Sequence, residues 1–259
     1  MYLSQLLINV GTNPDRPLPG RLWLRNMYRV HQRLCMAFPS ADRVAVDKEF
    51  ISPYAPEDFA AAFLRSDAQV HQMRDCETGF LFRVDSLPGQ AAILVQSAIE
   101  PKWDYAFQNA KCLLAVAPSE PRRVKLEIPA GMQLRFQLVA HPTKREALTK
   151  SERLAQGGKV KRPRTGVERE KLGEWLEGHA EPKCTKPESP GFHVDQVSVD
   201  TGFVYMNKTH DPEKGSSLLS AKFEGVLTIT DGTRFLRTLR RGIGPAKAFG
   251  FGLLSVARM

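Results

Sequence analysis

The order of strand and helix patterns along the chain is the feature that most restricts its fold. Residues 2–10 read as a strand, residues 27–38 as a helix, residues 79–86 and 91–99 as the strands of a hairpin around LPGQ, and residues 101–111 as a short helix. Asn26 is a good N-cap for the first helix. Its buried stripe is predicted to consist of Val30, Leu34 and Phe38, which recur every four residues.

The second half of the chain repeats this order. Residues 132–142, 192–208, 220–230 and 252–257 read as strands, and residues 166–179 and 231–242 read as helices. The side chains expected to face inward from the first of these helices are Val167, Leu172, Trp175 and Leu176. The second helix is predicted to start at a capping Asp231 and to stop at Gly242.

Both halves therefore read β–α–β–β–α–β, and we expect an α+β fold of two tandem ferredoxin-like (RRM-like, βαββαβ) domains. The linker candidate APSEPRR, residues 117–123, separates an N-terminal domain, 1–120, from a C-terminal domain, 121–259. The first domain carries an extra segment near 41–79, in which 56–66 has helical character. No repeat is visible in the sequence, so the duplication rests on element order. Because the strands lack the aromatic signature of RNA-recognition motifs, base stacking on a sheet is not expected.

Positive charge is concentrated in the middle of the chain. The net charge is +9, and residues 144–171 hold ten Lys and Arg against four Glu, so this segment carries +6. Such clustering is the electrostatic footprint of a polyanion partner. The alternative is a solvated basic loop without a partner.

Metal, disulfide and membrane functions find no support in the sequence. The cysteines, Cys35, Cys76, Cys112 and Cys184, contain no CxxC pair, and the six histidines contain no HxxxH. We therefore expect no metal and no small-molecule cofactor. The longest apolar run, AAILV, is too short to span a membrane, and MYLSQLLINV lacks the basic region of a signal peptide. These features predict a protein of the reducing cytoplasm without a membrane partner.

The C-terminal stretch RRGIGPAKAFGFGLLSV is rich in glycine. Its glycines are Gly242, Gly244, Gly250 and Gly252. In this stretch no lysine directly follows a glycine, which excludes a P-loop, and too few residues follow Gly252 for a dinucleotide-binding βαβ unit. Two readings fit the spacing. The loop either brings its backbone close to a phosphate, because glycine carries no Cβ, or it tightly connects a helix to a final strand.

The first helix holds the candidate catalytic residues. Tyr28 and His31 are three residues apart and so share a helical face, and Arg25, Arg29 and Arg33 repeat every four residues beside them. Histidine exchanges protons near neutral pH, tyrosine can donate or accept one, and arginines attract a phosphate. This set is sufficient to cut RNA without a metal, with a base activating the ribose 2′-hydroxyl and an acid protonating the departing 5′-oxygen.

A structural reading of His31 also fits the spacing. If the helix began earlier, one continuous apolar stripe would run through Leu24, Met27, His31, Leu34 and Phe38. The histidine would then be a core residue.

Three stretches together resemble a known family. They are YRVHQRLCMAFP near the N-terminus, LRFQLVAHPTKR with KVKRPR in the middle, and FEGVLTI with GIGPAKAFGFGLLSV at the end. They are similar to the CRISPR RNA-processing endoribonucleases of type I-E systems, the CasE subunits of Cascade within the RAMP superfamily. The resemblance covers most of the chain and leaves residues 41–79 unaccounted for.

The resemblance implies a fold, an activity and partners. The fold is tandem ferredoxin-like domains. The activity is metal-independent cleavage of a CRISPR repeat hairpin at the 3′ base of its stem, through 2′-hydroxyl attack that gives a 2′,3′-cyclic phosphate or 3′-phosphate. The enzyme is expected to stay on its product and to hold the 3′ hairpin of the crRNA among the other Cascade subunits.

The resemblance also implies roles for residues. The active-site histidine falls on His31 and the tyrosine on Tyr28. The stem-binding basic segment falls on Lys159, Lys161, Arg162 and Arg164, within the charged stretch that starts at Lys144. The glycine-rich ending resembles a loop expected near the RNA, where Lys247 would contact a phosphate. Some members carry several basic residues after the histidine, whereas this chain has Arg33 alone at that place.

Two other functions remain as alternatives. A non-catalytic RNA-binding subunit of the same assembly would share the fold but lack the acid–base pair, so Tyr28 with His31 separates it from the enzyme. A basic scaffold that binds nucleic acid without selectivity is the third possibility. Salt dependence does not separate the three, because all of them use phosphate contacts.

Overall fold

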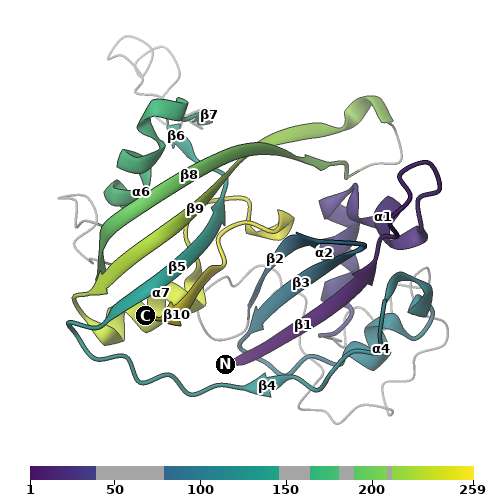
Figure 1. Ribbon diagram of the computed structural model, residues 1–259, viewed down its shortest axis with the longest axis horizontal. Helices are drawn as coiled ribbons and strands as arrows, with labels where there is room; N and C mark the ends of the chain where they lie inside the picture. The colour runs from purple at the N-terminus through teal and green to yellow at the C-terminus, as the bar shows by residue number, and fades with distance from the viewer. Residues whose placement is uncertain (39–78, 146–163, 181–189, 209–211) are drawn as a thin grey trace, which may run out of the picture.

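The computed structural model describes residues 1–38, 79–145, 164–180, 190–208 and 212–259, and these form two four-stranded antiparallel sheets, each with its own helices (Figure 1). The predicted extra segment near 41–79, its helix at 56–66 and most of the central basic stretch lie outside the described residues.

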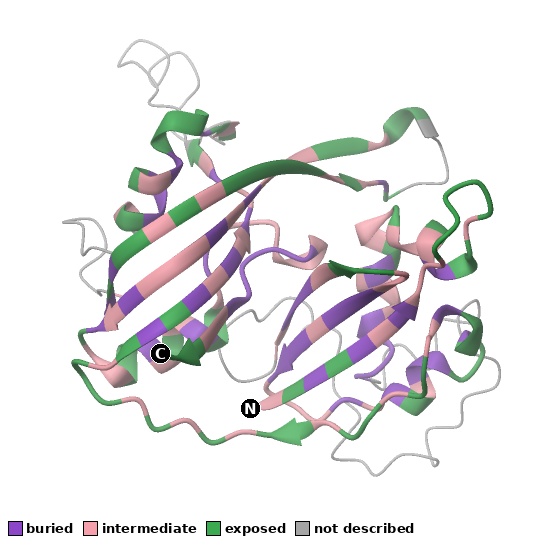
Figure 2. Cartoon of the chain, viewed as in Figure 1, coloured by how far each residue is buried: buried purple, intermediate pink, exposed green. Residues whose placement is uncertain are grey.

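The N-terminal half follows the predicted element order. Its elements are β1 (Tyr2–Asn9), α1 (Pro19–Leu24), α2 (Met27–Cys35), β2 (Phe80–Leu87), β3 (Gln90–Ser97), α4 (Trp103–Phe107), the 3-10 helix η4 (Lys111–Leu113) and β4 (Arg122–Arg123). The strands lie in the order β2-β3-β1-β4. Alternate residues of β1 are buried, as a strand with one covered face requires (Figure 2). Leu6 and Ile8 of β1 pack with Val30 and Leu34 of α2 in one apolar core.

The C-terminal half has the same arrangement with one insertion. Its elements are β5 (Gln133–Ala140), β6 (Thr143–Arg145), β7 (Arg164–Gly166), η5 (Arg169–Lys171), α6 (Leu172–Ala180), β8 (Phe192–Met206), η6 (Pro212–Lys214), β9 (Ser216–Ile229), α7 (Gly232–Arg241), η7 (Lys247–Phe249) and β10 (Leu254–Arg258). The main sheet has the order β10-β5-β9-β8, and β6 and β7 form a separate hairpin. A second core joins this sheet to Leu172 and Leu176 of α6 and to Phe235 of α7.

Both sheets thus place the fourth strand of the repeat beside the first, then the third and the second. This is the ferredoxin-like order, and the predicted α+β fold with two such units is confirmed. The predicted hairpin around LPGQ and the caps at Asp231 and Gly242 are also present. The division at residue 120 stays a prediction. In the structure β4 pairs with β1, so the chain passes between the sheets from Arg123 to Gln133.

The helix that carries the candidate catalytic residues, α2, is shorter than predicted. It starts at Met27, directly behind Asn26, but ends at Cys35 and not at residue 38. Residues 36–38 continue as a turn, and Phe38 is still buried. A separate short helix, α1, precedes it. Pro19 opens α1 because its fixed φ suits the first helical position.

Polar contacts join the two halves. The Arg83 side chain of β2 donates to Ser255 Oγ of β10 at 2.9 Å and is paired with Asp85. The buried Gln96 amide of β3 donates to the Leu239 carbonyl of α7 at 2.8 Å. The first bond joins strands of the two halves, and the second joins a strand of the N-terminal half to a helix of the C-terminal half.

Candidate active site

Asn26 fixes the start of α2 and ties it to the other half of the molecule. Its side-chain oxygen accepts from the Tyr28 backbone N–H at 3.1 Å, as an N-cap does. The same oxygen accepts from the Asn207 backbone N–H, and the Asn26 amide donates to the Asn207 carbonyl, both at 3.0 Å. In Figure 1 the long strands β8 and β9 extend from their sheet towards α1 and α2. The end of β8 therefore positions the first turn of the candidate catalytic helix.

His31 lies at the border of the apolar stripe. Val30 and Leu34 are completely buried, whereas His31 and Tyr28 are partly exposed. The imidazole stacks on two phenylalanines of β2, Phe80 with ring centres 5.5 Å apart and Phe82 at 6.3 Å. The reading that makes His31 a sealed core residue does not describe this geometry, because the residue is only partly buried. A partly exposed imidazole stacked on two aromatic rings can exchange a proton with a bound substrate.

The three arginines of the helix region have different surroundings. Arg25 and Arg29 are exposed, and their predicted contact with a phosphate stays a prediction. Arg33 points to α4, where it donates to the Ala106 carbonyl at 3.0 Å and to Asn109 Oδ1 at 2.8 Å. Burial lowers the pKa of the Arg33 guanidinium. Arg25 and Arg29 are therefore exposed side chains close to Tyr28 in the sequence, whereas Arg33 makes contacts within the protein.

The glycine-rich ending is a tight connection from α7 to β10 that packs against the candidate helix. Its η7 turn contacts both α2 and β2. Gly250 has φ +83°, and a Cβ on it would lie 3.3 Å from the Phe82 ring. Gly252 has φ +90°, and its N–H donates to the Val139 carbonyl of β5 at 2.7 Å. The glycines thus form the tight connection from a helix to the final strand that was one of the two predicted roles. Phe251 within it is completely buried. Their predicted approach to RNA stays a prediction.

One lysine lies in this connection and another contacts it. Lys247, singled out from the sequence, donates to the Arg241 carbonyl at 2.6 Å, and its backbone belongs to η7. Lys208, which the sequence analysis missed, holds its ammonium 5.8 Å from the centre of the Phe249 ring. In the sequence Lys208 is only the last residue of the strand predicted over 192–208, and that position is too general a signal to identify it.

The described part of the central basic segment forms the two paired strands of a hairpin, β6 and β7. Lys144 of β6 pairs with Thr165 of β7, and both Lys144 and Arg164 are exposed. Lys159, Lys161 and Arg162 lie outside the described residues. Two hydrogen bonds fix the hairpin to the C-terminal half. The Val167 N–H donates to the Pro142 carbonyl at 3.2 Å, and the Trp175 indole N–H of α6 donates to the Thr143 carbonyl at 3.3 Å.

A second group of cations was also missed. The exposed arginines of α7 are Arg234, Arg237, Arg240 and Arg241. Their three-residue spacing within DGTRFLRTLRRG is the signal that could have found them, because it places them near one face of the helix. Burial, and then the charges of Arg240 and Arg123, lower the pKa of the Met1 amine, so these two arginines lie close enough to the chain's N-terminus to act on it.

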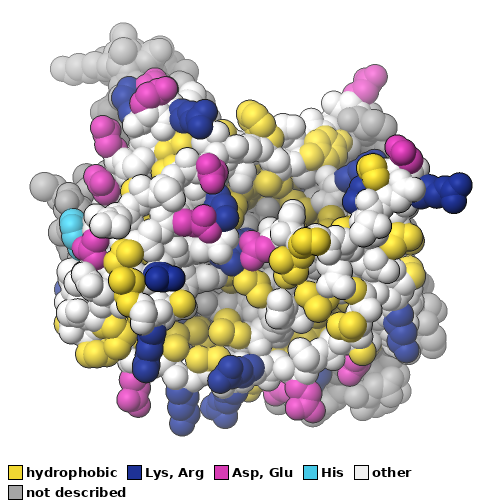
Figure 3. All heavy atoms as spheres, viewed as in Figure 1, with side chains coloured by type: hydrophobic (Ala, Val, Ile, Leu, Met, Phe, Trp, Pro, Cys, Tyr) yellow, Lys and Arg dark blue, Asp and Glu magenta, His cyan; other side chains and the backbone are white. Residues whose placement is uncertain are grey.

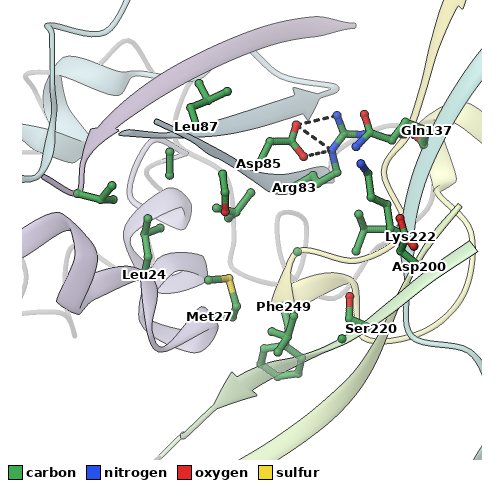
Figure 4. A pocket seen from close by; sticks show the side chains of 18 of the residues that line it. Leu24, Met27, Arg83, Asp85, Leu87, Gln137, Asp200, Ser220, Lys222 and Phe249 are labelled. Carbon is green, nitrogen blue, oxygen red and sulfur yellow. Dashed lines mark hydrogen bonds and ion pairs between the residues drawn. The ribbon is translucent and has the colours of Figure 1, made fainter. Parts of the chain in front are cut away.

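A groove of about 950 Å³ runs between the two halves but is electrically balanced. It is lined by three basic side chains, Arg21, Arg83 and Lys222, and three acidic ones, Asp85, Asp200 and Glu224. In Figure 4 Arg83 is held by Asp85, and Lys222 lies beside Asp200. Figure 3 shows charges of both signs over this hollow. A neutral lining does not attract a polyanion, and neither Tyr28 nor His31 is among the described residues that line it.

Within the described ranges, no group of three or more His, Cys, Asp and Glu side chains is arranged to hold a metal ion. No helix in those ranges is long and apolar enough to cross a bilayer.

Comparisons with known proteins agree with the fold. The model of a family described as CRISPR associated protein matches residues 1–258. The chain is 35% identical over 176 residues to the CRISPR-associated endoribonuclease Cse3 of Thermus thermophilus, covering 64% of this chain and 72% of that protein. It is 28% identical over 265 residues to the CRISPR system Cascade subunit CasE of Escherichia coli, covering 99% of each.

Solved structures show the same fold. A Cse3 endoribonuclease bound to a 19-nucleotide RNA superposes with a TM-score of 0.65 at 25% identity, over 99% of this chain and 100% of that one. Cas6e of Escherichia coli superposes with a TM-score of 0.58 at 25% identity, over the whole of both chains.

Proposed function

Since this chain belongs to the CRISPR associated protein family, we propose that it cleaves CRISPR precursor RNA within the repeat, at the 3′ base of the hairpin. It is a CRISPR endoribonuclease, and its partners are the repeat RNA and the other subunits of Cascade. After cleavage it stays bound to the 3′ hairpin of the crRNA. We expect this activity in the cytoplasm, because the cysteine spacings suggest no disulfide framework.

The proposed reaction uses the RNA, side chains of α2, and Arg25, which lies just before that helix. A base takes the proton of the ribose 2′-hydroxyl, and the 2′-oxygen attacks the neighbouring phosphorus. The bond from phosphorus to the 5′-oxygen breaks, and an acid protonates that oxygen. The products are a 2′,3′-cyclic phosphate, or the 3′-phosphate that its hydrolysis leaves, and a 5′-hydroxyl. Tyr28 and His31 supply the acid and the base, and Arg25 and Arg29 face the negative charge on the phosphate.

One observation carries this assignment. Two proton-transferring side chains, Tyr28 and His31, are partly exposed one turn apart on a helix whose start is fixed by Asn26, and the exposed Arg25 and Arg29 lie just before the helix and in its first turn. The helix is held on three sides, by β2, by the end of β8 and by η7. Such support keeps reacting groups in place, which is a large part of catalysis for a reaction whose nucleophile belongs to the substrate.

The decisive test uses the cognate repeat hairpin in EDTA, with either a ribose or a 2′-deoxyribose at the cut site. We expect cleavage of the ribose substrate, no cleavage of the deoxy substrate, and a product that ends in a cyclic phosphate or 3′-phosphate. Cleavage of the deoxy RNA contradicts the assigned nucleophile. Tight binding of both RNAs without any cleavage contradicts the enzyme and leaves a non-catalytic RNA-binding subunit.

A further inference from the structure

Cys35 is a buried thiol in direct contact with the candidate catalytic histidine. It lies one turn after His31 on α2 and is 1% exposed. Its Sγ is 3.5 Å from Nε2 and 3.9 Å from Nδ1 of the imidazole. A thiol is a weak donor and a weak acceptor, and these distances suit hydrogen bonds of sulfur. The reaction described above gives Cys35 no part.

The other neighbours of the imidazole restrict its ring plane. The ring lies 22° from the plane of Phe80 and 16° from that of Phe82. Phe82 is completely buried, and Phe80 is itself stacked on the buried Phe38 at 5.0 Å. Two aromatic rings therefore set the plane of the imidazole, but a half-turn about the Cβ–Cγ bond keeps this plane and exchanges nitrogen with carbon positions. A contact with the ring nitrogens distinguishes these two orientations.

We propose that Cys35 is a positioning residue that selects one of the two orientations of the His31 imidazole, related by a half-turn about Cβ–Cγ, that stack on Phe80 and Phe82. The thiol holds one part of the nitrogen-bearing edge, so that proton transfer occurs through a ring placed in one orientation. This inference rests on the proposed function, in which His31 moves a proton. Cys35 does not touch the RNA, and its effect passes through His31.

The test compares Cys35→Ala with Cys35→Ser. Alanine removes the contact with the imidazole, whereas serine keeps a group that can donate to it and accept from it. If Cys35 positions His31, alanine lowers the single-turnover cleavage rate by about 10- to 100-fold, the scale of a misplaced catalytic group, and serine lowers it less. The dissociation constant of the repeat hairpin stays unchanged in both variants.

Thermal unfolding separates positioning from simple core packing. A hydroxyl in this buried, largely apolar place costs stability, so serine melts no higher than alanine if the residue only fills space. The proposal therefore predicts that Cys35→Ser cleaves faster than Cys35→Ala although its melting temperature is no higher. Equal cleavage by alanine and wild type, or loss of cleavage that follows melting temperature, overturns the proposal.

A double-mutant comparison tests whether the effect passes through His31. In a His31→Ala background, measured over long time courses, Cys35→Ala should cause no further loss of the residual rate. A further loss of the same size as in the wild-type background shows that Cys35 acts elsewhere and overturns the proposal. Wild-type protein and His31→Ala serve as controls for the proposed function. If wild type fails to cleave, the function is wrong, whereas full activity of Cys35→Ala beside an inactive His31→Ala refutes the positioning role alone.

Discussion

Asn26 and Arg33 show that neighbouring side chains on one helix serve different ends. Asn26 caps α2 and holds Asn207, so it belongs to the frame of the site. Arg33 was grouped with Arg25 and Arg29 from its spacing alone, yet its guanidinium is bonded to the α4 region. Periodicity gives the face of a helix to within a third of a turn, and a long side chain can leave that face for a nearby carbonyl.

Arg33→Met tests this separation of roles. The variant keeps an aliphatic stem but leaves the Ala106 carbonyl without this donor, so the free energy of unfolding in urea should fall by about 1–3 kcal/mol. The exposed Arg29→Met should change stability by less than about 0.5 kcal/mol while weakening hairpin binding. An Arg33→Met protein as stable as wild type but deficient in RNA binding would reverse the assignment.

The glycine-rich connection is the element whose function the sequence could not decide. The sequence shows its four glycines and fits a tight connection. It does not show that η7 lies against α2, because that contact joins residues more than 200 positions apart in the sequence. By contrast, the caps of α2 and α7 are local signals, and both were predicted correctly from one residue each. The β6–β7 hairpin was missed because three-residue strands leave almost no alternation to detect.

Gly250→Ala should destabilise the protein and slow cleavage. Its positive φ is unfavourable for alanine, and the added Cβ presses on Phe82, which stacks on His31. We expect a loss of about 1–2 kcal/mol in the free energy of unfolding. Gly173→Ala is the matched control, because Gly173 lies in α6 with open space around it, and alanine there should stabilise by up to about 1 kcal/mol. Equal effects of the two substitutions would contradict this account of the loop.

The β6–β7 hairpin is the element that we expect to grip the RNA stem. Removing two exposed cations with Lys144→Ala and Arg164→Ala should weaken hairpin binding and reduce the slope of log K against log salt by about 2, one for each lost phosphate contact. We expect the same direction of change for Lys161 and Arg162. Lys222→Ala is the control, because Lys222 is paired with Glu224 at 2.9 Å beside the neutral groove. An unchanged salt slope in the double variant would leave the basic segment a solvated loop.

At the scale of the whole molecule, the two halves act as one support for α2. The duplication of element order was predictable because each half carries its own apolar pattern and builds its own core. The way the halves join was not, since it depends on isolated polar residues such as Gln96 and Arg83, which carry no periodic signal. Sequence therefore predicted the units well and their junction poorly.

Arg83→Met tests the junction. Arg83 is 3% exposed, and its loss leaves Asp85 without its partner. The free energy of unfolding should therefore fall by about 3 kcal/mol. This is the lower end of the range for a broken buried pair, because Asp85 keeps some contact with water. Adding Asp85→Leu should restore part of this stability, because no unpaired carboxylate then remains. Urea denaturation measures both. Wild-type stability in Arg83→Met would show that the pair does not hold the halves together.

The most direct test of the central claim is to measure cleavage and binding separately in His31→Ala. The account predicts that the single-turnover cleavage rate of the repeat hairpin falls by at least about 10²-fold, the contribution of one acid–base group, while the dissociation constant stays at the wild-type value. Cleavage at the wild-type rate would contradict it, and the catalytic role would then belong to residues outside α2.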